Sequence, residues 1–115
     1  MTGDCIFCKI AAGTIPARIV YQDDQVVAFH DLNPQAPTHV LVIPRRHLEN
    51  LAAAATGDEA LLGRLLLAAR QVAESEGIVA SGFRVVINTN ADAGQSVAHL
   101  HVHVLGGRRM GWPPG

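Results

Sequence analysis

The sequence has little net charge, few cysteines and no long hydrophobic run, and each shortage excludes a class of protein. A formal net charge of −1 provides no electrostatic footprint for binding DNA or RNA. The longest apolar stretches are far too short to span a bilayer, and residues 1–5 lack the basic and apolar regions of a signal peptide. We therefore expect a cytoplasmic protein with no nucleic-acid partner and no membrane association.

Enough apolar material is present for a core. Of the 115 residues, 49% are hydrophobic and 17% are charged, a balance that argues against disorder. This length predicts a single domain that spans residues 1–115.

The two cysteines, Cys5 and Cys8, are separated by two residues. In a cytosolic protein this spacing indicates a metal or redox site more often than a structural disulfide. No strand–helix context of the thioredoxin type precedes Cys5, which favours a metal site over a redox site. Two cysteines and two histidines would make a closed, structural zinc site. The residues alone leave its histidines open among His39, His47, His99, His101 and His103, and two reduced surface thiols are the alternative.

Residues 98–107 alternate histidine with apolar side chains and predict a β-strand. Side chains alternate between the faces of a strand, so the three histidines of this stretch share one face and the apolar residues take the other. Successive histidines would lie roughly 6.5–7 Å apart, close enough to share a bound ion, a phosphate or a proton path. A half-exposed strand with its histidines in water is the alternative, and three histidines on one face make it less favoured. The histidines are His99, His101 and His103.

The remaining pattern predicts a short helix at residues 6–12 and strands at 18–22, 26–32, 39–44 and 83–88. Thr56 and Glu59 fit a capping box at the start of a long helix over residues 58–76, which Gly77 ends. We expect a loose helical turn at 48–55 and a glycine-containing loop at 90–95. Runs of strands with one long helix predict an α+β fold with a mostly antiparallel sheet.

The histidine stretch is suited to nucleophilic catalysis on phosphorus. A neutral imidazole can attack phosphorus if a neighbour holds it in the right tautomer, and a same-face histidine can do this or bind phosphate. Residues 93–96 offer backbone N–H groups, an amide and a hydroxyl just before the stretch, donors that suit a phosphate and its transition-state charge. A catalytic metal on the three histidines is less favoured, because the cysteine pair offers zinc a better closed site.

The segment His99-Leu100-His101-Val102-His103-Val104-Leu105 resembles the signature of the histidine-triad (HIT) superfamily. Further segments are similar to its Hint branch, which hydrolyses purine nucleoside phosphoramidates. They are residues 29–39, 42–47, 94–97 and 106–108 and the terminal Trp112-Pro113-Pro114-Gly115. The resemblance covers nearly the whole chain. It implies a HIT-like α+β fold with roughly five antiparallel strands, one long and one short helix, and a homodimer with a continuous sheet.

The resemblance also implies roles for individual residues. His101 would attack the α-phosphorus, His103 would bind the phosphate, and His39 would lie in the same network. Ser96 would relay a proton to the leaving nitrogen, and Asp31 would bind the ribose hydroxyls because a carboxylate accepts two hydrogen bonds. The implied nucleotide site consists of Ile6, Phe7, Ile10, Phe29, His30, Asp31, Leu32, Asn88, Gly94, Gln95, Ser96, His101, His103 and Trp112, the last near the partner subunit's site.

The cysteine pair resembles that of zinc-bearing members, which implies a structural Zn²⁺ on Cys5, Cys8, His47 and His99. A zinc-bound His99 would not be a free acid or base. Two other functions stay open. Hydrolysis of dinucleoside polyphosphates, as in the Fhit-like branch, is disfavoured by Ser96 and by the Trp-Pro-Pro-Gly tail. A nucleotide-binding interaction module with incidental catalysis is not favoured, because every matching catalytic position is filled.

Overall fold

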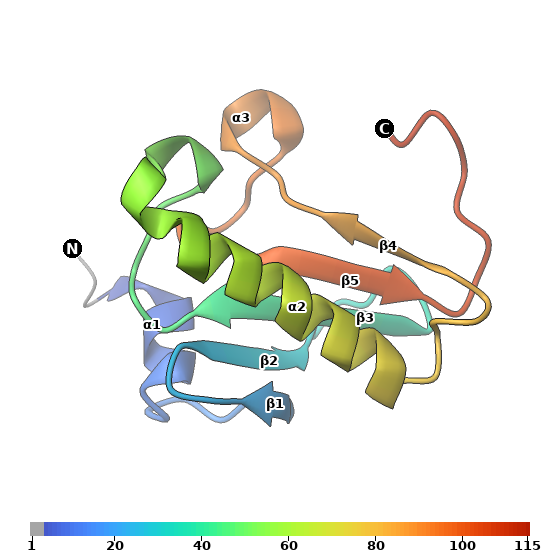
Figure 1. Cartoon of the computed structure of the whole chain (residues 1–115), viewed down its shortest axis with the longest axis horizontal. Coiled ribbons are helices and arrows are strands. Elements are labelled where there is room, and N and C mark those ends of the chain that lie inside the picture. Colours follow the sequence, from blue (N-terminus) through green and yellow to red (C-terminus); the bar gives the residue numbers. More distant parts are fainter. Residues whose placement is uncertain (1–3) are drawn as a thin grey trace.

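The computed structural model describes residues 4–115, in which five strands form one antiparallel sheet in the order β1-β2-β3-β5-β4 (Figure 1). The expected absence of a signal peptide rests partly on residues 1–3, which lie outside the described residues. The strands are Ile19–Gln22 (β1), Val26–His30 (β2), Thr38–Pro44 (β3), Phe83–Val86 (β4) and Val102–Gly106 (β5). The helices are Ile6–Ala11 (α1), Glu59–Ser75 (α2) and Asn90–Ala93 (α3). The predicted α+β fold is confirmed.

Alternation along the central strand β3 builds two apolar cores on opposite faces of the sheet. Val40 and Val42 belong to the core that α2 covers, whereas Leu41 and Ile43 pack with Phe7 of α1 on the other face. Every residue of β3 is buried, because both of its faces are covered and both of its edges are paired. The two helices therefore lie on opposite sides of the sheet (Figure 1).

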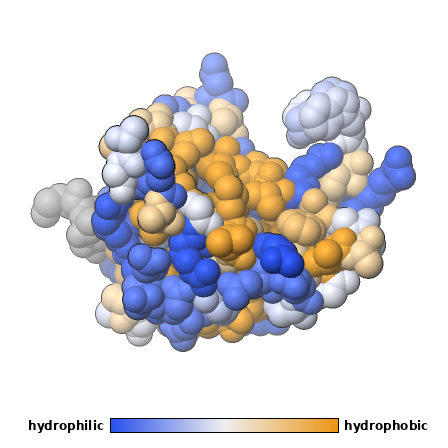
Figure 2. All heavy atoms as spheres, in the orientation of Figure 1, coloured by the Kyte–Doolittle hydropathy of each residue, from blue (hydrophilic) through white to orange (hydrophobic). Residues whose placement is uncertain are grey.

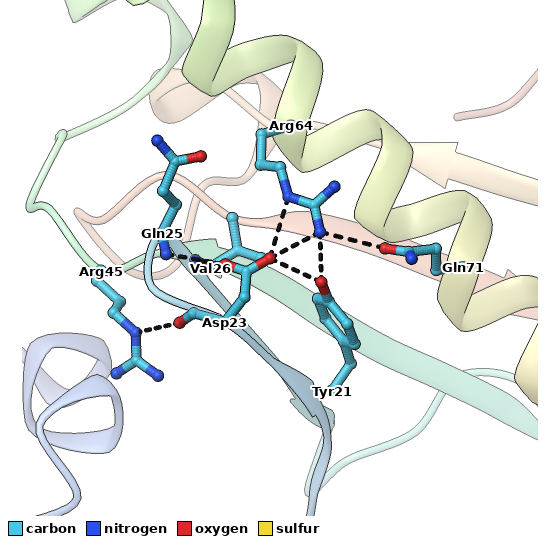
Figure 3. A network of polar contacts seen from close by, with 7 residues as sticks. All are labelled: Tyr21, Asp23, Gln25, Val26, Arg45, Arg64 and Gln71. Carbon is cyan, nitrogen blue, oxygen red and sulfur yellow. Dashed lines mark hydrogen bonds and ion pairs between the residues drawn. The ribbon is translucent and has the colours of Figure 1, made fainter.

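A polar network joins the hairpin between β1 and β2 to α2 (Figure 3). The Asp23 carboxylate accepts the backbone N–H groups of Gln25 and Val26 at 2.8 and 2.9 Å, which closes the turn. Its other oxygen accepts Arg64 at 2.6 Å and the Tyr21 hydroxyl at 2.7 Å. Burial alone would raise the pKa of Asp23, but these hydrogen bonds hold it well below its usual range. The charged network anchors the hairpin on the helix.

The start of α2 corrects the sequence prediction. Thr56 and Glu59 form no capping box; residues 56–58 form a 3₁₀ turn, and the helix begins at Glu59. The Asp58 carboxylate accepts the Ala55 N–H at 2.9 Å instead, and so supports the turn that precedes the helix. The predicted end of the helix is confirmed, since Gly77 follows it with a positive φ of +73°.

Three other expectations about local structure need correction. Only Leu51–Ala53 is helical in the segment 48–55, as a 3₁₀ turn whose Ala53 N–H is accepted by the Asn50 side chain. The expected loop at 90–95 begins with the short helix α3. The strand expected from residue 98 begins only at Val102, because the Leu100 N–H leaves the sheet and donates to the Leu48 carbonyl.

Within the described part of the chain, no helix combines the length and apolarity needed to cross a membrane. Apolar atoms nevertheless gather on the face of the molecule that displays α2 (Figure 2). Exposed large hydrophobic residues on α2 and on the edge strand β4 are Leu66, Leu67, Phe83 and Val85.

Candidate active site and metal cluster

A cavity of about 240 Å³ lies on the α1 side of the sheet. Of the residues predicted for the nucleotide site, those that line it are Ile6, Phe7, Ile10, Phe29, His30, Asp31, Leu32, Ser96, His101 and His103. The lining residues that the sequence reasoning missed are Pro16, Ala17, Arg18, Leu41 and Val97. Leu41 could have been found, because it shares a face of β3 with His39; the others precede or leave regular elements and carry no periodic signal.

His101 is oriented by the backbone of its own segment. Its Nδ1 lies 2.8 Å from the His99 carbonyl oxygen, which can only accept, so Nδ1 carries the proton. The Nε2 atom of neutral His101 therefore holds a free lone pair. The ring is 4% exposed and packs edge-on against Phe7, with 5.1 Å between the ring centroids. The residue is thus a buried imidazole with a nucleophilic nitrogen.

A second chain of contacts determines the tautomers of His39 and His103. The Gln35 backbone N–H donates to His39 Nδ1 at 3.0 Å, so the proton of neutral His39 is on Nε2. That Nε2–H donates to His103 Nδ1 at 2.9 Å, which leaves the proton of His103 on Nε2. Asp31 Oδ2 lies 3.4 Å from His39 Nε2. His39 does not line the cavity; it acts on it through His103.

Burial favours the neutral form of both of these histidines. Burial lowers the pKa of His39, and the negative charge of Asp31 opposes this only in part. Burial, together with the neighbouring charges of His101 and His39, lowers the pKa of His103 to about 4. His103 therefore presents an N–H donor to the cavity without carrying a full positive charge.

The cysteines converge with two histidines from distant parts of the chain. One donor atom each of Cys5, Cys8, His47 and His99 lies within 4.8 Å of all the others. Cys5 Sγ and His47 Nδ1 lie 3.2 Å from His99 Nδ1, and Cys8 Sγ lies 3.3 Å from His47 Nδ1. Tetrahedral coordination at ordinary Zn–N and Zn–S lengths separates ligand atoms by about 3.3–3.8 Å. The four residues are therefore placed closely enough to hold one metal ion.

The tautomer of His99 also fits a metal ligand. Its Nε2 lies 2.9 Å from the Pro44 carbonyl oxygen and must donate to it, which leaves the Nδ1 lone pair directed at the cysteines. Burial lowers the pKa of His99 and favours the neutral form that a metal requires. Burial raises the pKa of the Cys8 thiol to about 11, as does the nearby Cys5.

Four of the residues predicted for the nucleotide site do not line the cavity. The Gln95 amide donates to the carbonyls of Glu49 and Val97 at 2.9 and 3.0 Å, so it braces the loop before His99. Trp112 is 83% exposed in the C-terminal segment. The complete set is Asn88, Gly94, Gln95 and Trp112.

Comparison with known proteins shows the family and the fold. The model of the HIT domain matches residues 12–110. The chain belongs to the HIT family. An uncharacterized HIT-like protein from Synechocystis sp. is 56% identical over 115 residues, which is the full length of both chains. A HIT family hydrolase from Legionella pneumophila is 47% identical with a TM-score of 0.96, over 97% of this chain and 100% of that one. A histidine triad protein from Clostridium difficile is 43% identical with a TM-score of 0.92, over 95% of each chain.

The HIT signature is divided between two sites in this chain. His99 faces Cys5, whereas His101 and His103 line the cavity. The match to the HIT domain begins at residue 12, so the cysteines and α1 lie outside it. In this segment α1 forms one wall of the cavity, and Cys5 and Cys8 belong to the cluster of four residues.

Proposed function

We propose that this HIT protein hydrolyses the P–N bond of purine nucleoside phosphoramidates through a covalent nucleotidyl intermediate on His101. The observation that carries the proposal is the pair of opposite tautomers in one cavity. His101 has a lone pair on Nε2, and His103 has a proton on Nε2. One ring is arranged to attack phosphorus, and the other to hold a phosphate oxygen.

The remaining cavity residues would bind the other parts of the substrate. The apolar side chains, such as Ile6, Phe7 and Phe29, would enclose the purine base. Asp31 would accept hydrogen bonds from the ribose hydroxyls. The α-phosphate would then lie at His101 and His103, and Gln95 would act on this end of the substrate only through the loop that it braces.

The reaction would proceed in two displacements at phosphorus. The Nε2 lone pair of His101 attacks, the P–N bond to the amine breaks, and the amine leaves with a proton relayed by Ser96 from solvent. The Nδ1–H bond to the His99 carbonyl persists as the ring becomes cationic and stabilises that charge. Water then attacks phosphorus, the bond to Nε2 breaks, and the products are a nucleoside monophosphate, neutral His101 and a proton returned to solvent.

We further propose that the cluster of Cys5, Cys8, His47 and His99 binds Zn²⁺. Two thiolates and two imidazoles are a donor set that zinc prefers, and the spacing of the donor atoms suits a tetrahedron. With four protein ligands the ion would be structural and would brace the segment that leads to His101. The dinucleoside polyphosphate alternative has no structural observation in its favour.

The assembly we propose is a homodimer with a continuous sheet. In the described residues β4 pairs only with β5, so its outer edge presents unpaired backbone groups beside the exposed side chains of Phe83 and Val85. A second copy of the chain would cover this edge, and Trp112 would then approach the partner's cavity. Sedimentation of the purified protein tests the oligomeric state.

The test of the catalytic proposal is turnover of an adenosine 5′-phosphoramidate by the His101→Ala variant. We expect no measurable turnover with retained binding of adenosine monophosphate, while His103→Ala lowers kcat about 10²–10³-fold, as removal of one transition-state donor does. Nucleotide binding shows that each variant is folded. Near-normal kcat in His101→Ala would refute the mechanism, and faster cleavage of a dinucleoside polyphosphate in a competition assay would move the substrate to that class.

A further inference from the structure

Arg18 lines the cavity and directly precedes β1, and it belongs to no motif that the sequence offers. Its main chain is held in place, because its carbonyl accepts the His30 N–H at 3.0 Å. Its neighbours Pro16 and Ala17 line the cavity with it, as does Ile10 on the last turn of α1. Arg18 is thus rooted at the apolar part of the cavity with an exposed side chain.

The guanidinium of Arg18 makes no hydrogen bond or ion pair within residues 4–115. Most other arginines in this range are engaged by carbonyl, amide or carboxylate groups. The engaged residues are Arg45, Arg46, Arg64, Arg70, Arg84 and Arg108. Arg18 is therefore a residue of the cavity lining whose guanidinium donors are free for a ligand.

The other polar residues of the lining have tasks in the proposed function, on which this inference rests. His101, His103 and Ser96 serve the phosphate and the leaving nitrogen, and Asp31 serves the ribose. His30 and Arg18 remain for the base. Of these two, Arg18 lies among the apolar residues that would enclose a purine, and it has the longer reach.

We propose that Arg18 reads the edge of the purine and selects 6-oxopurines over adenine. A guanidinium has only donors, arranged as a fork. Guanine and hypoxanthine present two acceptors, O6 and N7, to such a fork, whereas adenine presents N7 beside an amino group that is itself a donor. Arg18 would satisfy both acceptors of an oxopurine, and would face one acceptor and one repelling donor on adenine.

The test is calorimetric binding of the 5′-monophosphates of guanosine, inosine and adenosine to the whole protein. We expect guanosine and inosine monophosphates to bind about five-fold or more tightly than adenosine monophosphate, the lower end of what a bidentate contact contributes. Arg18→Met keeps the apolar stem and should reduce this ratio to within about two-fold. Arg18→Lys, with a single-point donor, should give an intermediate ratio.

The ratio of affinities is the decisive readout, because loss of a positive charge would weaken all three anions alike. Arg70→Met, on the exposed face of α2 on the other side of the sheet, is the charge-matched control and should keep the wild-type ratio. Equal affinities in the wild type, or an unchanged ratio in Arg18→Met, would overturn the inference. Tight binding of guanosine but not inosine monophosphate would also overturn it, since the 2-amino group would then be read. Absence of all nucleotide binding would instead overturn the proposed function itself.

Discussion

Arg45 holds the C-terminal end of α1 against the rest of the protein. Its Nη1 donates to the Ala11 carbonyl at 2.7 Å, and its Nη2 donates to Gln22 Oε1 at 2.9 Å. Its Nε donates to the Asp23 carbonyl at 2.8 Å, a contact drawn in Figure 3. One guanidinium therefore joins the end of α1, the hairpin between β1 and β2, and the end of β3.

This contact matters for the cavity because α1 is only six residues long. An isolated helix of that length is not stable in water. The Ala11 carbonyl is one of the terminal carbonyls without a helical partner, and a cation there also suits the helix dipole. The proposed metal would hold the other end of α1, so Arg45 is the polar anchor of the end that carries Ile10.

We expect Arg45→Gln to weaken both the fold and the cavity. Each charge-assisted hydrogen bond contributes about 1.5–3 kcal/mol, but the three bonds share one half-buried group and are not additive. The estimate for the whole substitution is a loss of about 2–3 kcal/mol in the free energy of unfolding, measured by urea denaturation. The Kd for a nucleoside monophosphate should rise about 3–10-fold. The kcat should change less, because His101 and His103 are not part of α1.

Arg46→Gln is the matched control. Arg46 has 58% of its side chain exposed and pairs with Asp58 at 2.5 Å, and within residues 4–115 its side chain makes no hydrogen bond to α1. Only the Arg46 half of this pair is exposed, since Asp58 is 12% exposed, so the pair contributes about 1 kcal/mol, and nucleotide affinity should not change. The reasoning would be refuted if Arg45→Gln lost stability without any change in Kd, or if Arg46→Gln raised Kd equally. Arg45→Lys should restore part of the affinity, since an ammonium group can still reach one of the carbonyls.

Three further predictions concern the metal, the histidines and the core. Protein at a zinc concentration a thousand-fold above the Kd for zinc should have a free energy of unfolding about 4 kcal/mol higher than chelator-treated protein. Thermal melts should show this difference in the wild type, and Cys8→Ser should abolish it. Because burial depresses the pKa of His103 to about 4, the unfolded chain takes up the proton first as the pH falls. Stability should therefore be almost fully present above about pH 7 and fall by about 3 kcal/mol by pH 4, whereas His103→Asn should show a smaller decline in urea titrations. In Gly106→Ala the new Cβ would lie 2.6 Å from Ile78 Cδ1, so we expect a loss of about 1–3 kcal/mol in the same assay, compared with none for Gly111→Ala, which has open space.

Local sequence patterns predict much of the fold. Side chains alternate along the strand expected at residues 39–44, and the structure accordingly buries Val40 and Leu41 of β3 in the two separate cores. The end of α2 at Gly77 followed from a residue that adopts a positive φ without strain. The start of that helix did not follow, because Asp58 uses its carboxylate on Ala55 and displaces the expected capping pattern.

For the candidate site, the sequence predicts the types of residue that take part but not their arrangement in space. The sequence by itself determined that histidines would share one face of a segment, because alternation is a property of the local backbone. Which histidines join the cysteines was decided by tertiary structure, since His47 and His99 are brought together only when the chain folds. The same holds for Arg18, which nothing in its local sequence links to the cavity.

The histidine tautomers show most clearly what the sequence determines and what only the tertiary structure decides. The sequence supplied His39, His101 and His103, but a ring nitrogen is a donor or an acceptor only in relation to its neighbour. The Gln35 N–H and the His99 carbonyl make that choice, and the first of them acts on His103 across two paired strands. Local alternation therefore placed the imidazoles, and sheet pairing with the surrounding backbone decided which nitrogen of each can attack, donate or bind a metal.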